Sequence, residues 1–210
     1  MIKNILTPTI AVALSLVLFF LAGCGSVSKS SRFYVLSPMA SMETEKNMDS
    51  SEMQDITIGI SQVFLPKYLK KSQIVTRTGN NELHLAEFDR WAGKIEEDIG
   101  RVIAENLTSL LSTDKVLSFP AMEAVKLDYN IKLDISRFDG SLGDQIELIV
   151  LWVIFDDARN NIYGVKATHI IEPIQGRGYV DMVAAQSRAL AVFSQEIAAV
   201  IGQYRTRKKN

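Results

Sequence analysis

The chain has 210 residues, a formal net charge of −1 at pH 7 and 22% charged residues. This balance provides no basic field of the kind that attracts nucleic acid, so nucleic acid is excluded as an expected partner. The single cysteine, Cys24, permits no intrachain disulfide, and the apolar core must therefore supply the stability by itself. The length suits one domain.

The N-terminal segment has the features of a secretory signal peptide. Lys3 provides a cationic start, residues 10–21 form a short apolar block, and small residues precede a cleavage point. Residues 21–24 (Leu-Ala-Gly-Cys) resemble a bacterial lipobox. In that chemistry the Cys24 thiol receives a diacylglyceryl group, the preceding peptide bond is cut, and the new amino group is acylated. Residues 1–23 are therefore predicted to be removed, which leaves 187 residues with a net charge of −2.

The lipid on Cys24 is the expected anchor, and no other cofactor is predicted. A diacylglyceryl group and an N-acyl chain such as palmitate hold a bilayer stably, whereas a single acyl chain holds it marginally. Gly25 stands where enteric-type bacteria use aspartate to retain lipoproteins in the inner membrane, which favours the periplasmic side of the outer membrane. The alternative is an uncleaved membrane helix, but residues 10–21 fall short of the ~20 residues that a span requires.

The mature chain divides into three predicted parts. Residues 24–54 hold the lipidated cysteine, a short strand at 32–36 and a polar tether with four of the seven methionines. No period organises these methionines, so the tether is interpreted as solvated. Residues 55–206 form the folded domain, and residues 207–210 a basic tail. The tail suits the C-terminal end of a helix dipole and, alternatively, anionic lipid head groups.

The first half of the domain is predicted as a strand, a hairpin and a helix. Isoleucines alternate with small or polar residues over 56–60, which is typical of a half-buried strand. Residues 73–78 and 83–85 flank a Gly-Asn-Asn turn and are expected to form a hairpin. A helix follows, with Asp89 as its predicted N-cap and an apolar stripe over 91–111.

The second half is predicted as three strands and a helix. Residues 127–136 alternate strictly between apolar and polar side chains, and residues 139–140 (Asp-Gly) are predicted to begin a turn. Strands at 146–155 and 162–173 and a helix at 179–204 complete the domain. This order predicts an α+β fold, with a mixed, largely antiparallel sheet and two long amphipathic helices packed on one face.

The strand at 146–155 is apolar on both faces. Two helices cover only one face of a sheet, so the face formed by Ile149, Leu151, Val153 and Phe155 needs a second cover. We hypothesise that it contacts another subunit or a partner, because exposed apolar patches usually mark interfaces. The alternative, which the sequence leaves equally open, is that the N-terminal segment folds across this face.

The sequence contains no recognisable catalytic or metal-binding pattern. Neither of its two histidines, His84 and His169, has a metal ligand at a suitable spacing. His84 alternates with Leu83 and Leu85, which predicts a solvated side chain, whereas His169 is expected in the core or at a sheet edge. There is no Gly-x-Ser-x-Gly elbow and no phosphate loop. Aspartates near the strand ends, including Asp139, are attributed to turn formation.

Three segments, in their order and spacing, resemble the shared core of the PqiC (YmbA-type) lipoproteins: residues 64–69 (FLPKYL), 72–77 (SQIVTR) and 87–92 (EFDRWA). Residues 33–36 are similar to the family's N-terminal strand, and residues 137–201 fit its second half. The resemblance thus covers nearly the whole mature chain. Lys71-Ser72 and Gly93-Lys94 depart from the Arg-Pro and Glu-Pro pairs that are common in the family.

The resemblance implies a non-enzymatic function. These are auxiliary lipoproteins of ABC-type or MCE-type transport systems, so the expected role is intermembrane lipid transport and support of envelope integrity. The implied partners are a PqiB-like MCE-domain protein, whose tunnel crosses the periplasm, and a PqiA-like inner-membrane subunit. The lipoprotein is expected to dock the tunnel end as a homo-oligomeric ring. The alternatives are a periplasmic lipid-binding carrier and a periplasmic hydrolase, for which no nucleophile is recognisable.

Nine residues are candidate contacts with a partner. Trp and Arg are favoured interface anchors, and Arg77, Arg90 and Trp91 lie close to the hairpin and the predicted helix start. A structural charge pair is the alternative role for the two arginines, and Trp91 is assigned to the core. The candidates come from the arginines, the family-like segment and the second face of the apolar strand: Phe64, Leu65, Tyr68, Arg77, Arg90, Ile149, Leu151, Val153 and Phe155.

Overall fold

The computed structural model describes residues 30–39, 55–156 and 161–209. Ser31–Asn210 form one compact unit. Cys24 with its lipobox and the part of the tether at 40–54 lie outside the described residues, so the predictions made for them stay predictions. Within the described ranges, no helix combines the length and the apolar character needed to cross a membrane.

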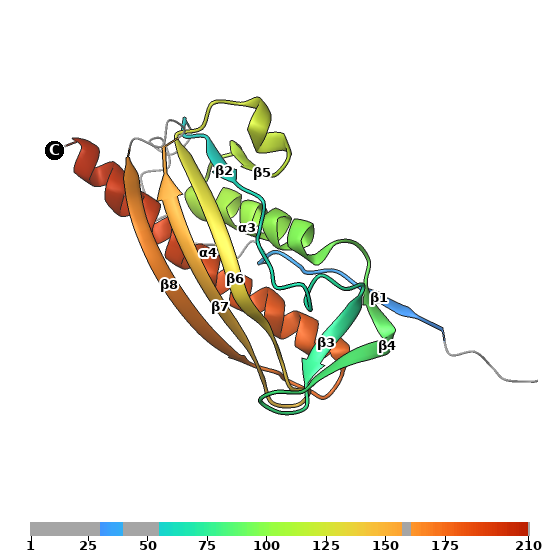
Figure 1. Ribbon diagram of the computed structural model, residues 1–210. Helices are drawn as coiled ribbons and strands as arrows, with labels where there is room; N and C mark the ends of the chain where they lie inside the picture. The colour runs from blue at the N-terminus through green and yellow to red at the C-terminus, as the bar shows by residue number, and fades with distance from the viewer. Residues whose placement is uncertain (1–29, 40–54, 157–160, 210) are drawn as a thin grey trace, which may run out of the picture. The chain divides into compact units, whose positions relative to one another are not determined.

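In the described part of the chain, eight strands form two open sheets (Figure 1). The three-stranded sheet has β4 (Leu83–Trp91) at its centre, with β1 (Arg32–Tyr34) parallel to it and β3 (Gln73–Arg77) antiparallel. The five-stranded sheet has the order β5 (Val116–Ser118), β2 (Ile58–Ile60), β6 (Tyr129–Gly140), β7 (Gln145–Phe155) and β8 (Ile162–Pro173). β2 is parallel to both neighbours, while β6, β7 and β8 form an antiparallel meander.

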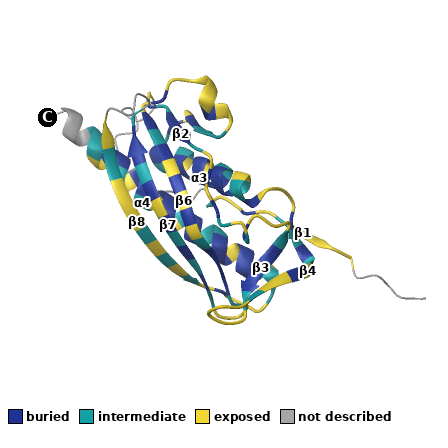
Figure 2. Ribbon diagram, viewed as in Figure 1, coloured by how far each residue is buried: buried dark blue, intermediate teal, exposed yellow. Residues whose placement is uncertain are grey.

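Both long helices lie on one face of the five-stranded sheet. α3 (Ile95–Leu111) packs against β2 and β5, α4 (Tyr179–Lys209) packs against β6, β7 and β8, and the two helices contact each other (Figure 1). Figure 2 shows the buried residues gathered between these layers. Trp152 of β7 is 1% exposed and meets Phe193 of α4 edge-on, with 5.8 Å between ring centroids. The predicted α+β class with two helices on one face is confirmed, although the strands divide over two sheets.

A short 3-10 helix, η1 (Ala121–Ala124), closes the opposite side of β2. A Cβ atom at Gly59 would lie 2.9 Å from the Met122 side chain and would overlap Leu127. Gly59 is buried together with the isoleucines beside it. β2 is therefore buried on both faces, and the prediction of a half-buried strand there is wrong.

The predicted N-terminus of the first helix is also wrong. Asp89 lies in β4, and α3 begins only at Ile95. The chain stays extended because β4 is paired on both sides: Trp91 N donates a hydrogen bond to Ser72 O at 2.7 Å, and Ala92 N donates to Tyr34 O at 2.9 Å. The sequence around β4 does not predict its pairing with β1, because β1 lies more than fifty residues earlier in the chain.

Asp89 has a buried structural role instead of a capping role. It is 5% exposed, accepts a hydrogen bond from the Tyr34 hydroxyl at 2.6 Å and forms an ion pair with Arg32 at 2.7 Å. α3 begins without a side-chain cap, and its first turn carries Glu96, Glu97 and Asp98. Those acidic side chains favour the positive end of the helix dipole.

The turn predicted at Asp139-Gly140 comes later in the chain. β6 continues through Gly140, and the following turn contains Gly143 with a φ of +79°. A Cβ atom at residue 140 would overlap the backbone of Gln145 on β7, so glycine is required there for close strand approach. Asp139 is fully buried and ion-paired, and the Asp-Gly turn signal was therefore misleading.

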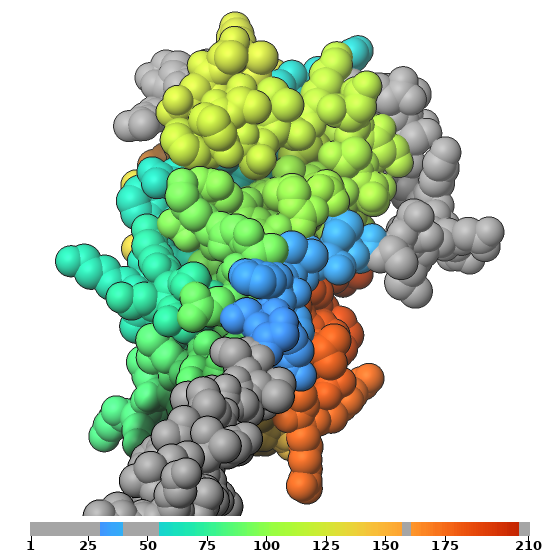
Figure 3. All heavy atoms as spheres, turned by 90° about the vertical axis from the view of Figure 1, so that its right-hand side faces the viewer, coloured from blue at the N-terminus to red at the C-terminus, as the bar shows by residue number. Residues whose placement is uncertain are grey.

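The described N-terminal segment, residues 30–39, lies along the helices. Leu36 is 1% exposed, and its N–H donates to Asp98 Oδ2 of α3 at 2.7 Å. The N–H of Ser37 donates to Ser187 Oγ of α4 at 3.1 Å. Figure 3 shows this segment in blue at the surface between α3 and α4. This part of the N-terminal segment therefore does not fold across the second face of β7.

Candidate docking surface

The second face of β7 carries apolar side chains that are open to solvent. The side chains of β7 that point toward the helices are at most 1% exposed: Leu148, Val150, Trp152 and Ile154. Leu151, which points the other way, is 51% exposed. The register places Leu151 opposite Ala167 of β8, and Val153 opposite Val165, which is 61% exposed. Directly opposite residues share a face of the sheet, so β8 extends the apolar surface to the sheet edge.

Phe64 extends this surface on the other side. An isolated bridge joins it to Asp134 of β6, which is itself the register partner of Leu151. The Phe64 side chain is 45% exposed, and Lys132 Nζ lies 5.2 Å from the centroid of its ring. We refer to these apolar residues on the side of the sheet opposite the helices as the open face: Phe64, Ile149, Leu151, Val153, Val165, Ala167 and Ile171.

The open face contains four of the nine residues that were predicted to contact a partner. Phe64, Ile149, Leu151 and Val153 lie together there and are exposed or half-buried. Phe155 is only 9% exposed, because the regular register breaks between Ile154 and this residue. The expectation that Phe155 belongs to the exposed second face is corrected accordingly.

The remaining candidates lie elsewhere. Leu65 is 9% exposed and lies in the core. Arg90 of β4 is half-buried, and its Nε atom has no hydrogen-bond partner in the structure. Trp91 is 7% exposed, as predicted for a core residue. The predicted contacts therefore do not form a single surface.

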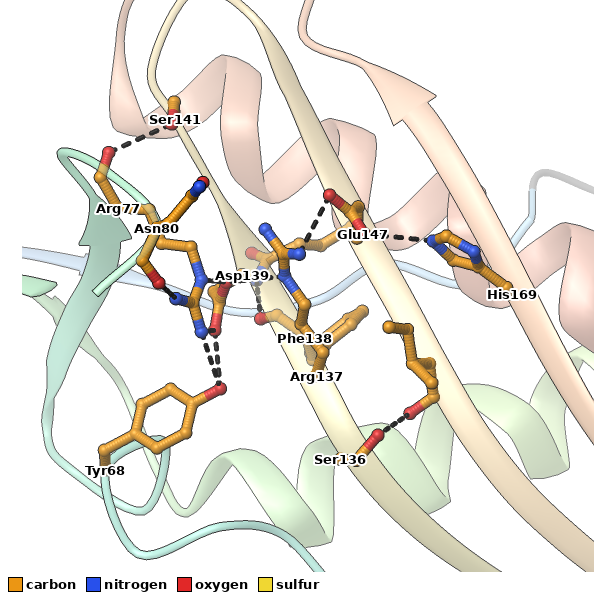
Figure 4. A network of polar contacts seen from close by, with 12 residues as sticks. Tyr68, Arg77, Asn80, Ser136, Arg137, Phe138, Asp139, Ser141, Glu147 and His169 are labelled. Carbon is orange, nitrogen blue, oxygen red and sulfur yellow. Dashed lines mark hydrogen bonds and ion pairs between the residues drawn. The ribbon is translucent and has the colours of Figure 1, made fainter. Parts of the chain in front are cut away.

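Tyr68 and Arg77 belong to a buried polar network at the end of the sheet, which Figure 4 shows in close-up. Its centre is Asp139 of β6, with a fully buried side chain. Asp139 Oδ1 lies 2.5 Å from Arg77 Nε of β3 and 3.2 Å from Arg137 Nε, while Oδ2 accepts a hydrogen bond from the Tyr68 hydroxyl at 2.7 Å. This carboxylate therefore joins the three-stranded sheet to the five-stranded sheet.

The network continues onto the open face. Arg137 Nη1 lies 2.9 Å from Glu147 Oε1 of β7, and Glu147 Oε2 lies 3.0 Å from His169 Nε2 of β8 (Figure 4). The His169 side chain is 50% exposed. Of the two places predicted for His169, the sheet edge is therefore correct and the core is not. His84 is exposed, as predicted.

The burial of this network changes its acid–base properties. Desolvation, together with the hydrogen bond to Asp139, raises the pKa of Tyr68 to about 12. The hydrogen bond to Asp139 likewise raises the pKa of Arg77 above its ordinary value. Arg77 and Tyr68 thus both contact the buried Asp139 side chain, and the geometry of Arg77 is that of a structural ion pair. This was the alternative role that the sequence allowed for Arg77.

The described residues contain no group of three or more His, Cys, Asp and Glu side chains that could hold a metal ion. A pocket between the two sheets and both helices is lined by Trp91, Phe138, Gln186 and their neighbours, and it has a volume of about 10 Å³. Such a volume holds about one water molecule. This pocket therefore has no room for an acyl chain.

Sequence reasoning missed two parts of the site. The contribution of β8 was missed because the alternation of Val165, Ala167 and Ile171 did not distinguish a core face from an exposed edge strand, and the structure leaves all three exposed. The network around Asp139 was missed because an Asp-Gly pair is a strong turn signal. Its detectable signal was the presence of two arginines, Arg77 and Arg137, in segments that resemble the family.

The main exposed feature of this α+β domain is thus the apolar side chains on one face of its larger sheet. The model of one protein family, the ABC-type transport auxiliary lipoprotein component, matches residues 34–198, and the chain therefore belongs to this family. It is similar to the intermembrane transport lipoprotein PqiC of Escherichia coli K12, with 22% identity over 86% of this chain and 90% of the relative. The PqiC of Shigella flexneri matches to the same extent.

Solved structures show the same fold. An uncharacterized protein of known crystal structure superposes with a TM-score of 0.67 at 19% identity, covering 82% of this chain and 99% of the other. Protein XCC0632 of Xanthomonas campestris superposes with a TM-score of 0.62 at 14% identity, covering 85% and 97%. At these identities the likeness supports the fold alone.

Proposed function

We propose that this chain is a non-enzymatic lipoprotein subunit of an intermembrane lipid transport system. The observation that carries the proposal is the similarity to PqiC over 86% of the chain, together with the family match. In this proposal the lipids on Cys24 fix the protein to the periplasmic side of the outer membrane. The folded unit then docks the end of a PqiB-like MCE tunnel, which a PqiA-like subunit connects to the inner membrane.

The open face is the surface we assign to assembly, either between subunits of a ring or with the tunnel protein. Its apolar residues run across β7 and β8, where Leu151 and Val165 are more than half exposed. Burial of apolar area at about 25 cal/mol per Å² favours their removal from water. Charged side chains also lie within this face: Asp134 lies between Phe64 and Leu151, and Lys132 is the register partner of Val153. Such a mixture of apolar and polar area is typical of non-obligate protein interfaces.

The test is affinity purification of the Cys24-lipidated protein from detergent-solubilised envelope, with measurement of the oligomer mass and mass spectrometry of its partners. We expect a multimer that carries an MCE-domain protein. Leu151→Glu should weaken this assembly by about 30-fold or more, because a buried unpaired charge costs an interface about 2 kcal/mol or more. Val192→Glu on α4 is the matched control, since Val192 is 45% exposed and Leu151 is 51% exposed.

The two variants separate assembly from folding. Both residues are about half exposed, so both proteins should keep their unfolding midpoints. A lone monomer with bound lipid would contradict the docking function and support a carrier. An assembly that tolerates Leu151→Glu as well as Val192→Glu would show that the open face is not the contact.

A further inference from the structure

A second exposed surface lies on the outer side of the three-stranded sheet. Tyr34 of β1 points inward and donates a hydrogen bond to Asp89. Its neighbours Phe33 and Val35 point the opposite way and are 65% and 55% exposed. Phe33 is the register partner of Arg90 on β4, so the two share the outer face. No element of the described fold covers these two apolar side chains.

Cations lie beside the apolar pair. Glu97 and Asp98 of α3 line the same hollow as Val35, but they are ion-paired with Lys94 and Arg101 respectively. Gln73 at the start of β3 is the register partner of Arg90, and Trp91 N donates to Ser72 O at 2.7 Å, which places Lys70 and Lys71 at the same end of the sheet. Both lysines are exposed. Neither these lysines nor Arg90 form an ion pair with any described residue. We refer to these five residues as the anchor-side surface: Phe33, Val35, Lys70, Lys71 and Arg90.

The chain length places this surface near the membrane. Seven residues separate Cys24 from Arg32, where β1 begins. Even fully extended, they reach at most about 30 Å. A compact unit of 180 residues has a radius of gyration of about 16 Å and is therefore more than about 30 Å across, so its far side lies beyond this reach. The β1 side is thus the side that the anchor holds closest to the bilayer.

We propose that the anchor-side surface lies on the phospholipid bilayer. Phe33 and Val35 enter the interfacial region, while Arg90, Lys70 and Lys71 meet lipid phosphates. The proposal rests on the lipid anchor at Cys24 that the proposed function assumes. It adds a fixed orientation: the membrane contact restrains the domain, and the open face is presented sideways to a partner. The occupant is lipid because the surface combines apolar side chains with unpaired positive charge at the point where the lipidated tether joins the fold.

The experiment uses the full lipidated protein in vesicles of phosphatidylethanolamine with a minor share of phosphatidylglycerol. Since Cys24 is the only cysteine in the chain and carries the lipid, a cysteine introduced by Val35→Cys accepts a fluorescent label uniquely. Leu151→Cys on the open face is the matched control, because its exposure of 51% is close to the 55% of Val35. Contact with the bilayer should blue-shift the emission of the label at residue 35, and nitroxide lipids should quench it. The label at residue 151 should show neither change.

The charge contribution is tested in the same vesicles. Adding Lys70→Gln and Lys71→Gln to the labelled Val35→Cys protein should lower the ratio of membrane-contacting to free orientations by about 25-fold, since each basic residue near an anionic surface contributes roughly fivefold. Vesicles of phosphatidylcholine alone should reduce the quenching in the same direction.

Flotation of the vesicles separates two kinds of failure. A protein that does not float lacks the lipid anchor, and that result overturns the proposed function and this orientation together. A protein that floats with an unquenched label at residue 35, or with stronger quenching at residue 151, overturns the orientation alone. Since the vesicles contain no partner protein, the outcome does not depend on docking.

Discussion

Replacing Arg77 with methionine tests whether this residue is a structural ion pair or a partner contact. Asp139 has no exposed side-chain surface, and Arg77 is its nearest cation at 2.5 Å. Removing one partner of a buried ion pair costs about 3–5 kcal/mol, because the remaining charge is left without compensation. Asp139 keeps Arg137 at 3.2 Å and the Tyr68 hydroxyl at 2.7 Å, so the lower end applies. We expect Arg77→Met to lower the free energy of unfolding by about 3 kcal/mol.

The assay is urea unfolding of the mature domain, followed by tryptophan fluorescence. Trp91 and Trp152 are 7% and 1% exposed, so both report the opening of the core. Lys126→Met is the control, because Lys126 is exposed and has no ion-pair partner among the described residues; it should change stability by no more than about 0.5 kcal/mol.

A double-mutant cycle with Asp139→Asn isolates the pair itself. Once the buried charge is removed, Arg77→Met should cost only about 1 kcal/mol, so the two substitutions should be coupled by about 2 kcal/mol. A loss below about 1 kcal/mol for Arg77→Met, or strictly additive effects, would refute the structural role. Weaker partner binding with unchanged stability would restore the interpretation of Arg77 as a contact.

Two further predictions concern pH and backbone packing. The fold raises the pKa of Tyr68 from an ordinary value of 10 to about 12. The protonated hydroxyl therefore contributes fully to stability below pH 10, and this contribution is lost as the pH rises through 12. In Tyr68→Phe, the urea midpoint should fall less steeply over this alkaline range. Gly140→Ala should destabilise the domain by about 1–3 kcal/mol, seen as a lower Tm, because the new methyl group overlaps Gln145. Gly79→Ala, where nothing lies within 4 Å, should leave the Tm nearly unchanged. Equal Tm values for the two glycine variants would contradict the packing argument.

The sequence predicted the parts of the fold that repeat with a regular period. β6 alternates over Tyr129–Ile135 because one of its faces lies on the helices, and this pattern is visible without a structure. The apolar strand β7 correctly indicated a second apolar face that the two helices do not cover. Pairings between distant segments escaped prediction: Asp89 has a good capping side chain, but the partner strand that keeps it extended lies at Arg32–Tyr34.

The site was harder to predict than the fold, because exposure depends on which face of the sheet the helices cover. Val165 and Ile171 have core-type side chains, but they lie on the face away from the helices, where they are 61% and 50% exposed. Asp139 shows the opposite behaviour. Its residue type is common in exposed turns, but its side chain is fully buried and ion-paired with Arg77 and Arg137. Local chemistry therefore indicated candidate residues but not which of them share a surface.

The two exposed surfaces are suited to different tasks because they differ in chemistry and in place. The open face is largely apolar, with charges of both signs among its apolar residues, whereas the unpaired charges of the anchor-side surface are all positive. Figure 1 looks onto the open face in front of the helices, and Figure 3, turned by 90°, looks onto the side of β1. A lipoprotein that rests on lipid through Phe33 and Arg90 would leave Leu151 free for protein contact. Membrane attachment and assembly would then be compatible in one small domain, because neither surface has to be released for the other to bind.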